Sequence, residues 1–404
     1  MSVLDFLCDI RFHKSYVLPP NPETGRCAPY RVSYADYGES KSNAVVLFCG
    51  ALMGSRFCYS PLDQLAKAYN VRIIHPDRPG IGGSQPVDLE KRIQTWLEMV
   101  PLLLAHLNIT HVSLASHSGG DIYLINTMLT YPCLLHPETP YVCFFAPWVH
   151  HSHSKISQLR ATDLLPAPIV GKFVSIVKFV NDNVTPLAGL SGGFVQGIRD
   201  SMHRSTPIPL TPTTLSKRTR GTSLFSHEEP AELSLDDDLV VEELRRHITA
   251  FLFAECMDGI KADVQLFLRK PRSVTWCSSS VFWSDFDYAV PLISKMIDEE
   301  GCIDGVCRMW TVDTFHAQTD AMVGEKGKMW FDSCWMSHQW TAEPCKTEDL
   351  YASYLPSRNS YKYRSQVVEG TEHNYLMDPA FGASETWLQR VRDSFPLPFE
   401  VDVA

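Results

Sequence analysis

The sequence predicts an α/β fold built on a doubly wound, mostly parallel β-sheet. Several short runs rich in β-branched and aromatic residues end at glycine, proline or a polar turn, as buried strands do. Segments with apolar residues at helical spacing lie between these runs. Such alternation is typical of parallel strands joined by right-handed crossover helices. The strand candidates are 44–50, 71–80, 111–116 and 141–149, and the helix candidates are 59–69, 88–107 and 121–129.

The pattern changes after residue 149, and few strand signals occur for more than a hundred residues. We therefore expect residues 1–149 to form the first part of a core and 150–272 a helical cap, with helices at 172–180 and 239–268. Residues 205–238 contain several prolines and many Ser and Thr residues but few large apolar ones, which predicts a long mobile loop.

The second part of the core is expected at 273–404. Its strand candidates are 273–283 (SVTWCSSSVFW) and 365–369 (SQVVE), and an extra insertion rich in aromatic residues is expected between them, at about 298–364. Residues 31–38 (RVSYADYG) alternate in polarity and precede the parallel pattern. They are expected to form an antiparallel edge strand.

Composition excludes some classes of partner. The chain has 404 residues, of which 45% are hydrophobic, and a formal net charge of −10 without a basic cluster. Binding to nucleic acid is therefore not expected, and a small or apolar partner is favoured. The first residues lack the pattern of a secretory signal, and the most apolar run, Met99–Ala105, is too short to span a bilayer. We expect a cytoplasmic protein without a membrane span.

The stretch SLASHSGGDIYL suggests a nucleophilic serine, Ser118, at a turn between a strand and a helix. In such a nucleophile elbow the residues two before and two after the serine must be small, and Ser116 and Gly120 meet this requirement. The N–H of Gly119 would lie at the helix start and could stabilise an oxyanion. A second donor is expected from the loop after 44–50, where the N–H of Ala51 is favoured and that of Leu52 is the alternative.

A nucleophilic serine also needs a base and a carboxylate that orients it. His373, after the last expected strand, is the predicted base. Asp287 is the predicted acid because it follows the expected strand at 273–283; Asp285 is nearer the strand, and Asp313 and Asp320 are weaker substitutes. The order nucleophile, acid, histidine is the one known from enzymes with a nucleophile elbow.

These segments together resemble the α/β-hydrolase superfamily. FCGALMG, HPDRPGIGGS, ASHSGG, FWSDFDYAVP and EGTEHNYL occur in that family's order. The resemblance implies an eight-stranded, mostly parallel sheet with helices on both faces and a helical cap inserted after the sixth strand. It also implies a catalytic triad of Ser118, Asp287 and His373, with Ala51 and Gly119 as oxyanion donors.

The resulting functional prediction is a serine hydrolase that cleaves an ester, lactone or thioester of a moderately apolar small molecule. Acyl transfer or carbon–carbon bond hydrolysis by the same triad, and a ligand receptor or non-catalytic scaffold, are the alternatives. No cofactor is expected. A metal is not expected either, because His150, His151 and His153 have no further ligands at suitable spacing. The residues that bind the substrate and the oligomeric state are not determined by the sequence.

Overall fold

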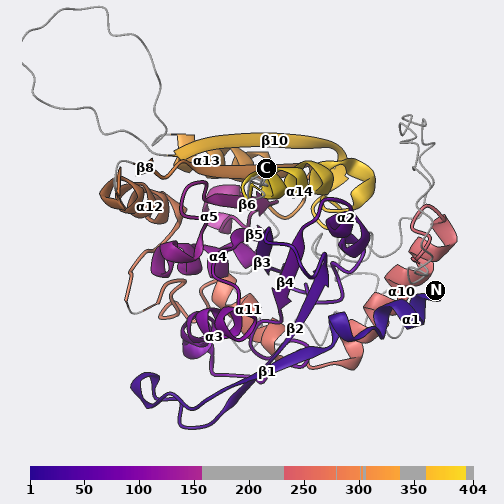
Figure 1. The fold of residues 1–404 in the computed structure, drawn as a ribbon. Helices are drawn as coiled ribbons and strands as arrows, with labels where there is room; N and C mark the ends of the chain where they lie inside the picture. The colour runs from indigo at the N-terminus through magenta and orange to yellow at the C-terminus, as the bar shows by residue number, and fades with distance from the viewer. Residues whose placement is uncertain (157–231, 279, 301, 304–305, 337–360, 397–404) are drawn as a thin grey trace, which may run out of the picture.

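A central eight-stranded sheet organises the protein (Figure 1). The computed structural model describes residues 1–156, 232–278, 280–300, 302–303, 306–336 and 361–396. The strand order is β1-β2-β4-β3-β5-β6-β9-β10. The strands are β1 (Lys14–Leu18), β2 (Tyr30–Gly38), β3 (Val45–Cys49), β4 (Arg72–Pro76), β5 (Ser113–His117), β6 (Tyr141–Phe145), β9 (Trp310–Thr319) and β10 (Tyr361–Glu372); β7 (Cys302–Ile303) and β8 (Val306–Cys307) form a separate hairpin.

The sheet is parallel from β4 to β10, and only the pairs β1–β2 and β2–β4 are antiparallel. This confirms the predicted α/β fold with a mostly parallel sheet. The central strands β3, β5 and β6 are buried along their whole length, because helices cover both of their faces. The carboxyl ends of these strands therefore meet at one edge, where the loops that follow them lie close together.

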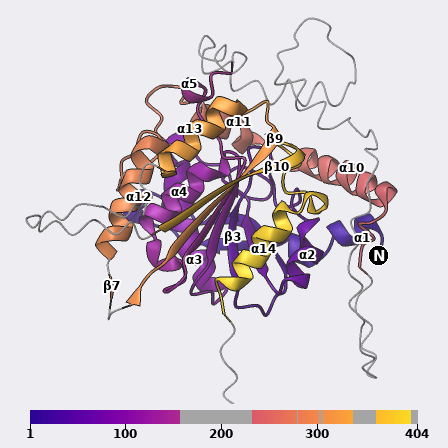
Figure 2. The same cartoon turned by 90° about the horizontal axis from the view of Figure 1, so that it is seen from above.

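Helices pack on both faces of the sheet, as Figures 1 and 2 show. Trp96, Tyr123 and Phe331 belong to the apolar core on one face, and Phe48, Leu62 and Trp387 to the core on the other. The first face is covered by α3 (Arg92–His106), α4 (Gly120–Thr130), α12 (Phe286–Glu300) and α13 (Gly324–Met336), and the second by α1 (Val3–Leu7), α2 (Leu62–Ala68) and α14 (Ala383–Asp393).

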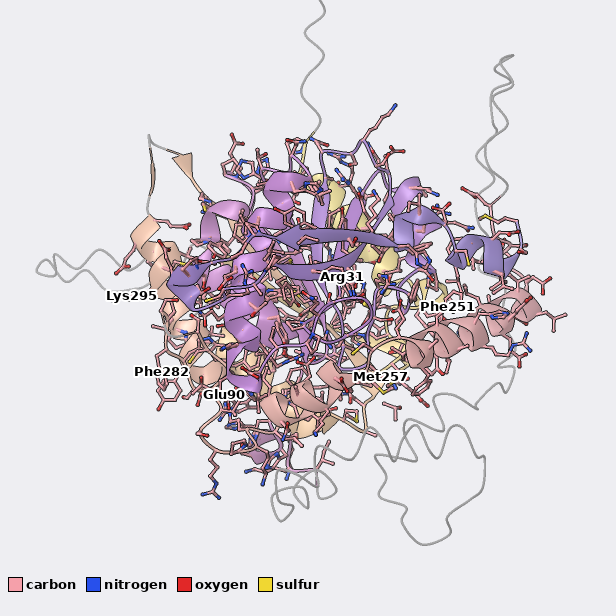
Figure 3. The ribbon with its side chains drawn as sticks, turned by 90° about the horizontal axis from the view of Figure 1, so that it is seen from below. Arg31, Glu90, Phe251, Met257, Phe282 and Lys295 are labelled. Carbon is pink, nitrogen blue, oxygen red and sulfur yellow. The ribbon has the colours of Figure 1, made fainter. Side chains whose placement is uncertain are left out.

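Three described helices follow β6 within the predicted cap: α5 (His151–Ser154), α10 (Asp238–Ala254) and α11 (Asp258–Phe267). The two longer ones confirm the helical prediction for 239–268. In the view from below, Phe251 lies on α10 and Met257 marks its junction with α11, whereas Phe282 and Lys295 lie on the opposite side of the molecule (Figure 3). The helix predicted at 172–180, and residues 205–231 of the predicted loop, lie outside the described residues.

Two strand predictions need correction. Residues 31–38 do form an antiparallel strand, within β2, but β1 occupies the edge beside it. The described part of 273–283 is not a strand, because its backbone bonds to the side chain of Asn126 on α4 instead of to a neighbouring strand. Asn126 Nδ2 donates to the carbonyl of Trp276, and its Oδ1 accepts from the N–H of Ser278. The sheet continues with β9, which lies inside the predicted insertion at 298–364.

Candidate active site

Ser118 occupies the sharp turn between β5 and α4. Its φ angle is 50°, in the left-handed region that residues with a side chain rarely adopt. The N–H of Ser118 donates to the carbonyl of Phe145 at 2.9 Å, which ties this turn to the end of β6. A Cβ atom on Gly120 would lie 2.1 Å from the carbonyl oxygen of Cys49, so this position requires glycine. The turn has the geometry of a nucleophile elbow.

His373 and Asp320 form a hydrogen-bonded line with Ser118. His373 Nε2 lies 2.9 Å from Ser118 Oγ, and His373 Nδ1 lies 2.9 Å from Asp320 Oδ2. A carboxylate only accepts hydrogen bonds, so the imidazole proton is on Nδ1. Nε2 is then free to accept the proton of the Ser118 hydroxyl. The side chains of His373 and Asp320 are 7% and 2% exposed, so bulk water hardly competes for these bonds.

The carboxylate of Asp320 is stabilised in its ionised form. It follows β9 directly, and its Oδ1 accepts from the N–H groups of Met322 and Val323 at 2.9 and 2.8 Å. Burial alone would raise its pKa, but the attraction of His373 and these hydrogen bonds outweigh burial and lower the pKa below its usual 3.8. A charged group therefore faces the imidazole at neutral pH.

Asp287, the acid predicted from the sequence, does not lie beside His373. Asp287 is exposed and lies in the first turn of α12. Asp285, the alternative, is buried and has other partners than His373. Its Oδ2 lies 3.3 Å from His153 Nε2 and 3.4 Å from Arg269. The prediction of Asp287 is wrong in this respect because it depended on a strand at 273–283; the strand next to β10 is β9, and Asp320 follows it.

The two predicted oxyanion donors differ in their surroundings. Gly119 is the N-cap residue of α4, and its N–H bonds to no atom of the described residues. The N–H of Ala51, in contrast, donates to Tyr59 Oη at 3.0 Å and is engaged within the protein. The N–H of the alternative, Leu52, has no acceptor among the described residues. In this structure Gly119 and Leu52, rather than Gly119 and Ala51, carry available N–H groups.

Arg78 fixes the loop after β3, which carries Ala51 and Leu52. Its guanidinium donates to the carbonyls of Gly50, Ala51 and Leu52, the last two at 2.7 and 3.0 Å. Because it holds three successive carbonyls, Arg78 limits how the peptide planes of this loop can turn. Arg78 is itself 1% exposed, and such a buried charge needs a partner. The local sequence signal for Arg78 is a charge two residues beyond the buried strand β4, and this signal does not reveal its partner.

That partner is Asp263, on cap helix α11. One of its carboxylate oxygens accepts from Arg78 at 2.7 Å, and the other accepts from Arg92 and from the hydroxyl of Tyr123. All four side chains are buried. The cap also touches the elbow directly, since a Cβ atom on Gly119 would lie 2.2 Å from the ring of Phe267. The helix α11 is thus connected through Asp263 and Arg78 to the loop after β3, and through Phe267 it contacts the N-cap of α4.

The histidines at 150–153 lie at the start of the cap. His153 stacks on Trp330 with ring centroids 3.8 Å apart and lies near Asp285. Within the described part of the chain, no three His, Cys, Asp or Glu side chains are grouped so that they could hold a metal ion. None of the described helices is both long and apolar enough to cross a membrane.

A sheet of this order with a serine at the elbow after β5 defines the α/β-hydrolase fold. Two solved structures of epoxide hydrolases agree with this fold. An epoxide hydrolase from Vigna radiata has a TM-score of 0.52 and 12% identity, with 96% of this chain and all (100%) of that one covered. A variant of a Vigna radiata epoxide hydrolase gives 0.50 and 12%, with 95% and 98% covered. A carboxylesterase from Nitrososphaera gargenis gives 0.49 and 12%, with 94% and 99% covered.

At such identities the likeness concerns the fold alone. No family model matches the sequence, and the comparison with curated proteins found no match. The chemistry of the site therefore has to be argued from its own residues.

Proposed function

We propose that the protein is a serine hydrolase that cleaves an ester, lactone or thioester of a moderately apolar small molecule through an acyl-enzyme. The observation that carries this proposal is the line from Ser118 through His373 to Asp320, with 2.9 Å at each step. A serine hydroxyl is a weak nucleophile at neutral pH and needs such a base and orienting carboxylate. This arrangement has no evident use in a scaffold that only keeps the fold.

In the proposed reaction, Ser118 Oγ attacks the acyl carbon while its proton passes to His373 Nε2. Asp320 remains ionised and stabilises the imidazolium that forms. The negative charge on the acyl oxygen is received by the N–H of Gly119 and the N–H of Leu52. Each donor of this kind contributes about 3 kcal/mol to the transition state. His373 then protonates the departing alcohol or thiol, and water, activated by the same imidazole, releases the acyl group from Ser118.

The residue at the nucleophile position favours acyl chemistry over two other reactions. Epoxide hydrolases and haloalkane dehalogenases with this kind of elbow attack through a carboxylate, and here the position holds Ser118. A serine gives an acyl-enzyme only with a substrate that carries a carbonyl carbon next to a leaving group. The cap residue Phe267 and the half-buried Leu52 near the elbow favour a partly apolar substrate.

The proposal is tested with an active-site probe and a chromogenic ester. A fluorophosphonate should label the wild-type protein once, at Ser118, as peptide mapping would locate it. The Ser118→Ala variant should lose both the labelling and the hydrolysis of a short p-nitrophenyl ester. Ser294→Ala, which removes a buried serine hydroxyl on α12, is the matched control and should keep both. Undiminished labelling of Ser118→Ala, or a wild-type protein inert toward panels of esters, lactones and thioesters, would contradict the proposal.

A further inference from the structure

A chain of hydrogen bonds connects the oxyanion loop to the loop of the catalytic base. The N–H of Ala51 donates to Tyr59 Oη at 3.0 Å, and Tyr59 Oη lies 2.9 Å from His117 Nδ1. His117 Nε2 in turn lies 2.9 Å from the carbonyl oxygen of His373. His117 directly precedes Ser118, so the chain passes next to the nucleophile. Tyr59, His117 and His373 are all buried.

The chemistry of these groups leaves one assignment of the protons. The carbonyl of His373 can only accept, so His117 carries its proton on Nε2. Burial, together with the nearby His373, lowers the pKa of His117 to about 3, so the ring is neutral and Nδ1 is bare. Burial also raises the pKa of Tyr59 well above its usual value, and its hydroxyl remains protonated. Tyr59 therefore donates to Nδ1 and accepts from Ala51.

We infer that Tyr59 and His117 are positioning residues, which hold the oxyanion loop and the His373 backbone in register with each other for the reaction at Ser118. The expected effect of these residues on kcat rests on the proposed function, whereas the hydrogen-bonded chain itself does not depend on it. Neither residue touches the reacting atoms in this role. They act through the Ala51 peptide, whose neighbour Leu52 carries an available N–H, and through the peptide of His373.

The surrounding packing suits a rigid connection. The Tyr59 ring meets Phe48 edge-on at 4.6 Å and His75 at 5.2 Å, and the His117 ring lies 5.5 Å from that of His373. Arg78 holds the carbonyls of Ala51 and Leu52 from the other side of the same loop. With its carbonyls bonded to Arg78 and the Ala51 N–H bonded to Tyr59, the loop has little freedom to reorient the next N–H, that of Leu52.

Kinetics on the p-nitrophenyl ester test the functional part. Tyr59→Phe removes only the hydroxyl and should lower kcat about tenfold, the rate equivalent of one hydrogen bond, while KM changes little. Tyr37→Phe removes a buried hydroxyl that has no partner among the described atoms and should leave kcat unchanged. His117→Leu should lower kcat at least as much as Tyr59→Phe, and His117→Gln, which keeps a donor of similar reach, should recover part of the loss. The double variant Tyr59→Phe/His117→Leu should be no slower than His117→Leu, because both changes break one chain.

Nitrogen-15 NMR of histidine-labelled protein tests the structural part without any substrate. His117, assigned by the signals missing in His117→Gln, should appear as a neutral ring protonated on Nε2 throughout pH 5–8. Tyr59→Phe should shift its Nδ1 resonance. Protonation of His117 in that range, or a proton on Nδ1, would overturn the inference. So would wild-type kcat in both Tyr59→Phe and His117→Leu in a protein that the fluorophosphonate labels at Ser118. A failure of that labelling in wild type would instead count against the proposed function.

Discussion

Asp320 directly follows β9, and His373 directly follows the neighbouring parallel strand β10. Their side chains are 2.9 Å apart. The register pairs the preceding residues, Thr319 of β9 and Glu372 of β10, directly. The carboxyl ends of parallel strands lie at one edge of a sheet, so this pairing alone brings the acid to the imidazole. The choice of acid is therefore fixed by which strand lies next to β10.

The first prediction concerns this carboxylate. Asp320→Asn should lower kcat on the p-nitrophenyl ester by about 10³- to 10⁴-fold, because an amide no longer stabilises the imidazolium and can favour the wrong tautomer. Asp287→Asn and Asp285→Asn are the matched controls and should stay near wild type. Thermal unfolding of each variant separates loss of activity from loss of fold. A large loss of kcat in Asp287→Asn, with Asp320→Asn still active, would instead identify Asp287 on α12 as the acid.

The second prediction concerns the oxyanion donor that we propose in the loop after β3, the N–H of Leu52. The N–H of Gly54 bonds to the carbonyl of Ala51 at 2.7 Å, so Leu52 is the first central residue of a turn, where proline is well accepted. Leu52→Pro removes the N–H and should lower kcat about 10²- to 10³-fold.

Leu52→Ala keeps the N–H and serves as the control for the lost side chain. Because only the side chain is shortened, we expect a change in KM while most of kcat is kept. Stopped-flow measurement of the acylation burst would place the loss of Leu52→Pro in the chemical step. Equal kcat values for the proline and alanine variants would show that the Leu52 N–H is not a donor.

Most of the sheet and two of the three residues in the hydrogen-bonded line could be predicted from the sequence. Strands β3, β4, β5 and β6 are short apolar runs that end at turn residues, and both signals are local. Ser118 directly follows one of these runs and is followed by an apolar helix. His373 follows the last strand near the C-terminus. These local features can be recognised without knowing which strands pair in the sheet.

The acid and the loop contacts depend on tertiary pairing and could not be predicted in the same way. Residues 273–283 have strand-like composition, but Trp276 packs in the core and its carbonyl bonds to Asn126, 150 residues away. Arg78 and Asp263 are 185 residues apart in the chain. Neither position shows in its own neighbourhood that it holds a partner, so propensity and spacing could not connect them.

The third prediction is a dependence of stability on pH. Burial lowers the pKa of His75 from 6.5 to about 3, with Arg78 and Arg56 acting in the same direction. Below pH 6.5 the unfolded chain binds a proton at this site that the folded protein does not, so the site's contribution to stability is present above pH 6.5 and is lost as pH falls toward 3. Between pH 7.5 and 5 this loss amounts to about 2 kcal/mol.

Urea unfolding at pH 7.5 and pH 5 of wild type and His75→Phe measures this contribution. Phenylalanine keeps the edge-on ring contacts with Phe48 and Tyr59 and cannot titrate. The comparison of variants is needed because Asp121, whose pKa is raised well above 3.8 by burial, contributes with the opposite sign. The variant should lose less stability than wild type on acidification, and an identical loss in both would exclude a neutral buried His75.

The fourth prediction concerns the junction of cap and core at Asp263. Asp263→Asn leaves the guanidiniums of Arg78 and Arg92 buried without their counter-charge, and breaking such a pair typically costs about 3–5 kcal/mol of unfolding free energy. Glu299→Gln, which breaks the exposed pair with Lys295, should leave stability unchanged. Because Arg78 holds the carbonyls of Ala51 and Leu52, the fraction of Asp263→Asn that remains folded should also show a lower kcat on the p-nitrophenyl ester. Titration of active sites with the fluorophosphonate gives kcat per folded molecule and separates the two effects. A variant with wild-type kcat per titrated site would mean that the cap stabilises the fold without orienting the oxyanion loop.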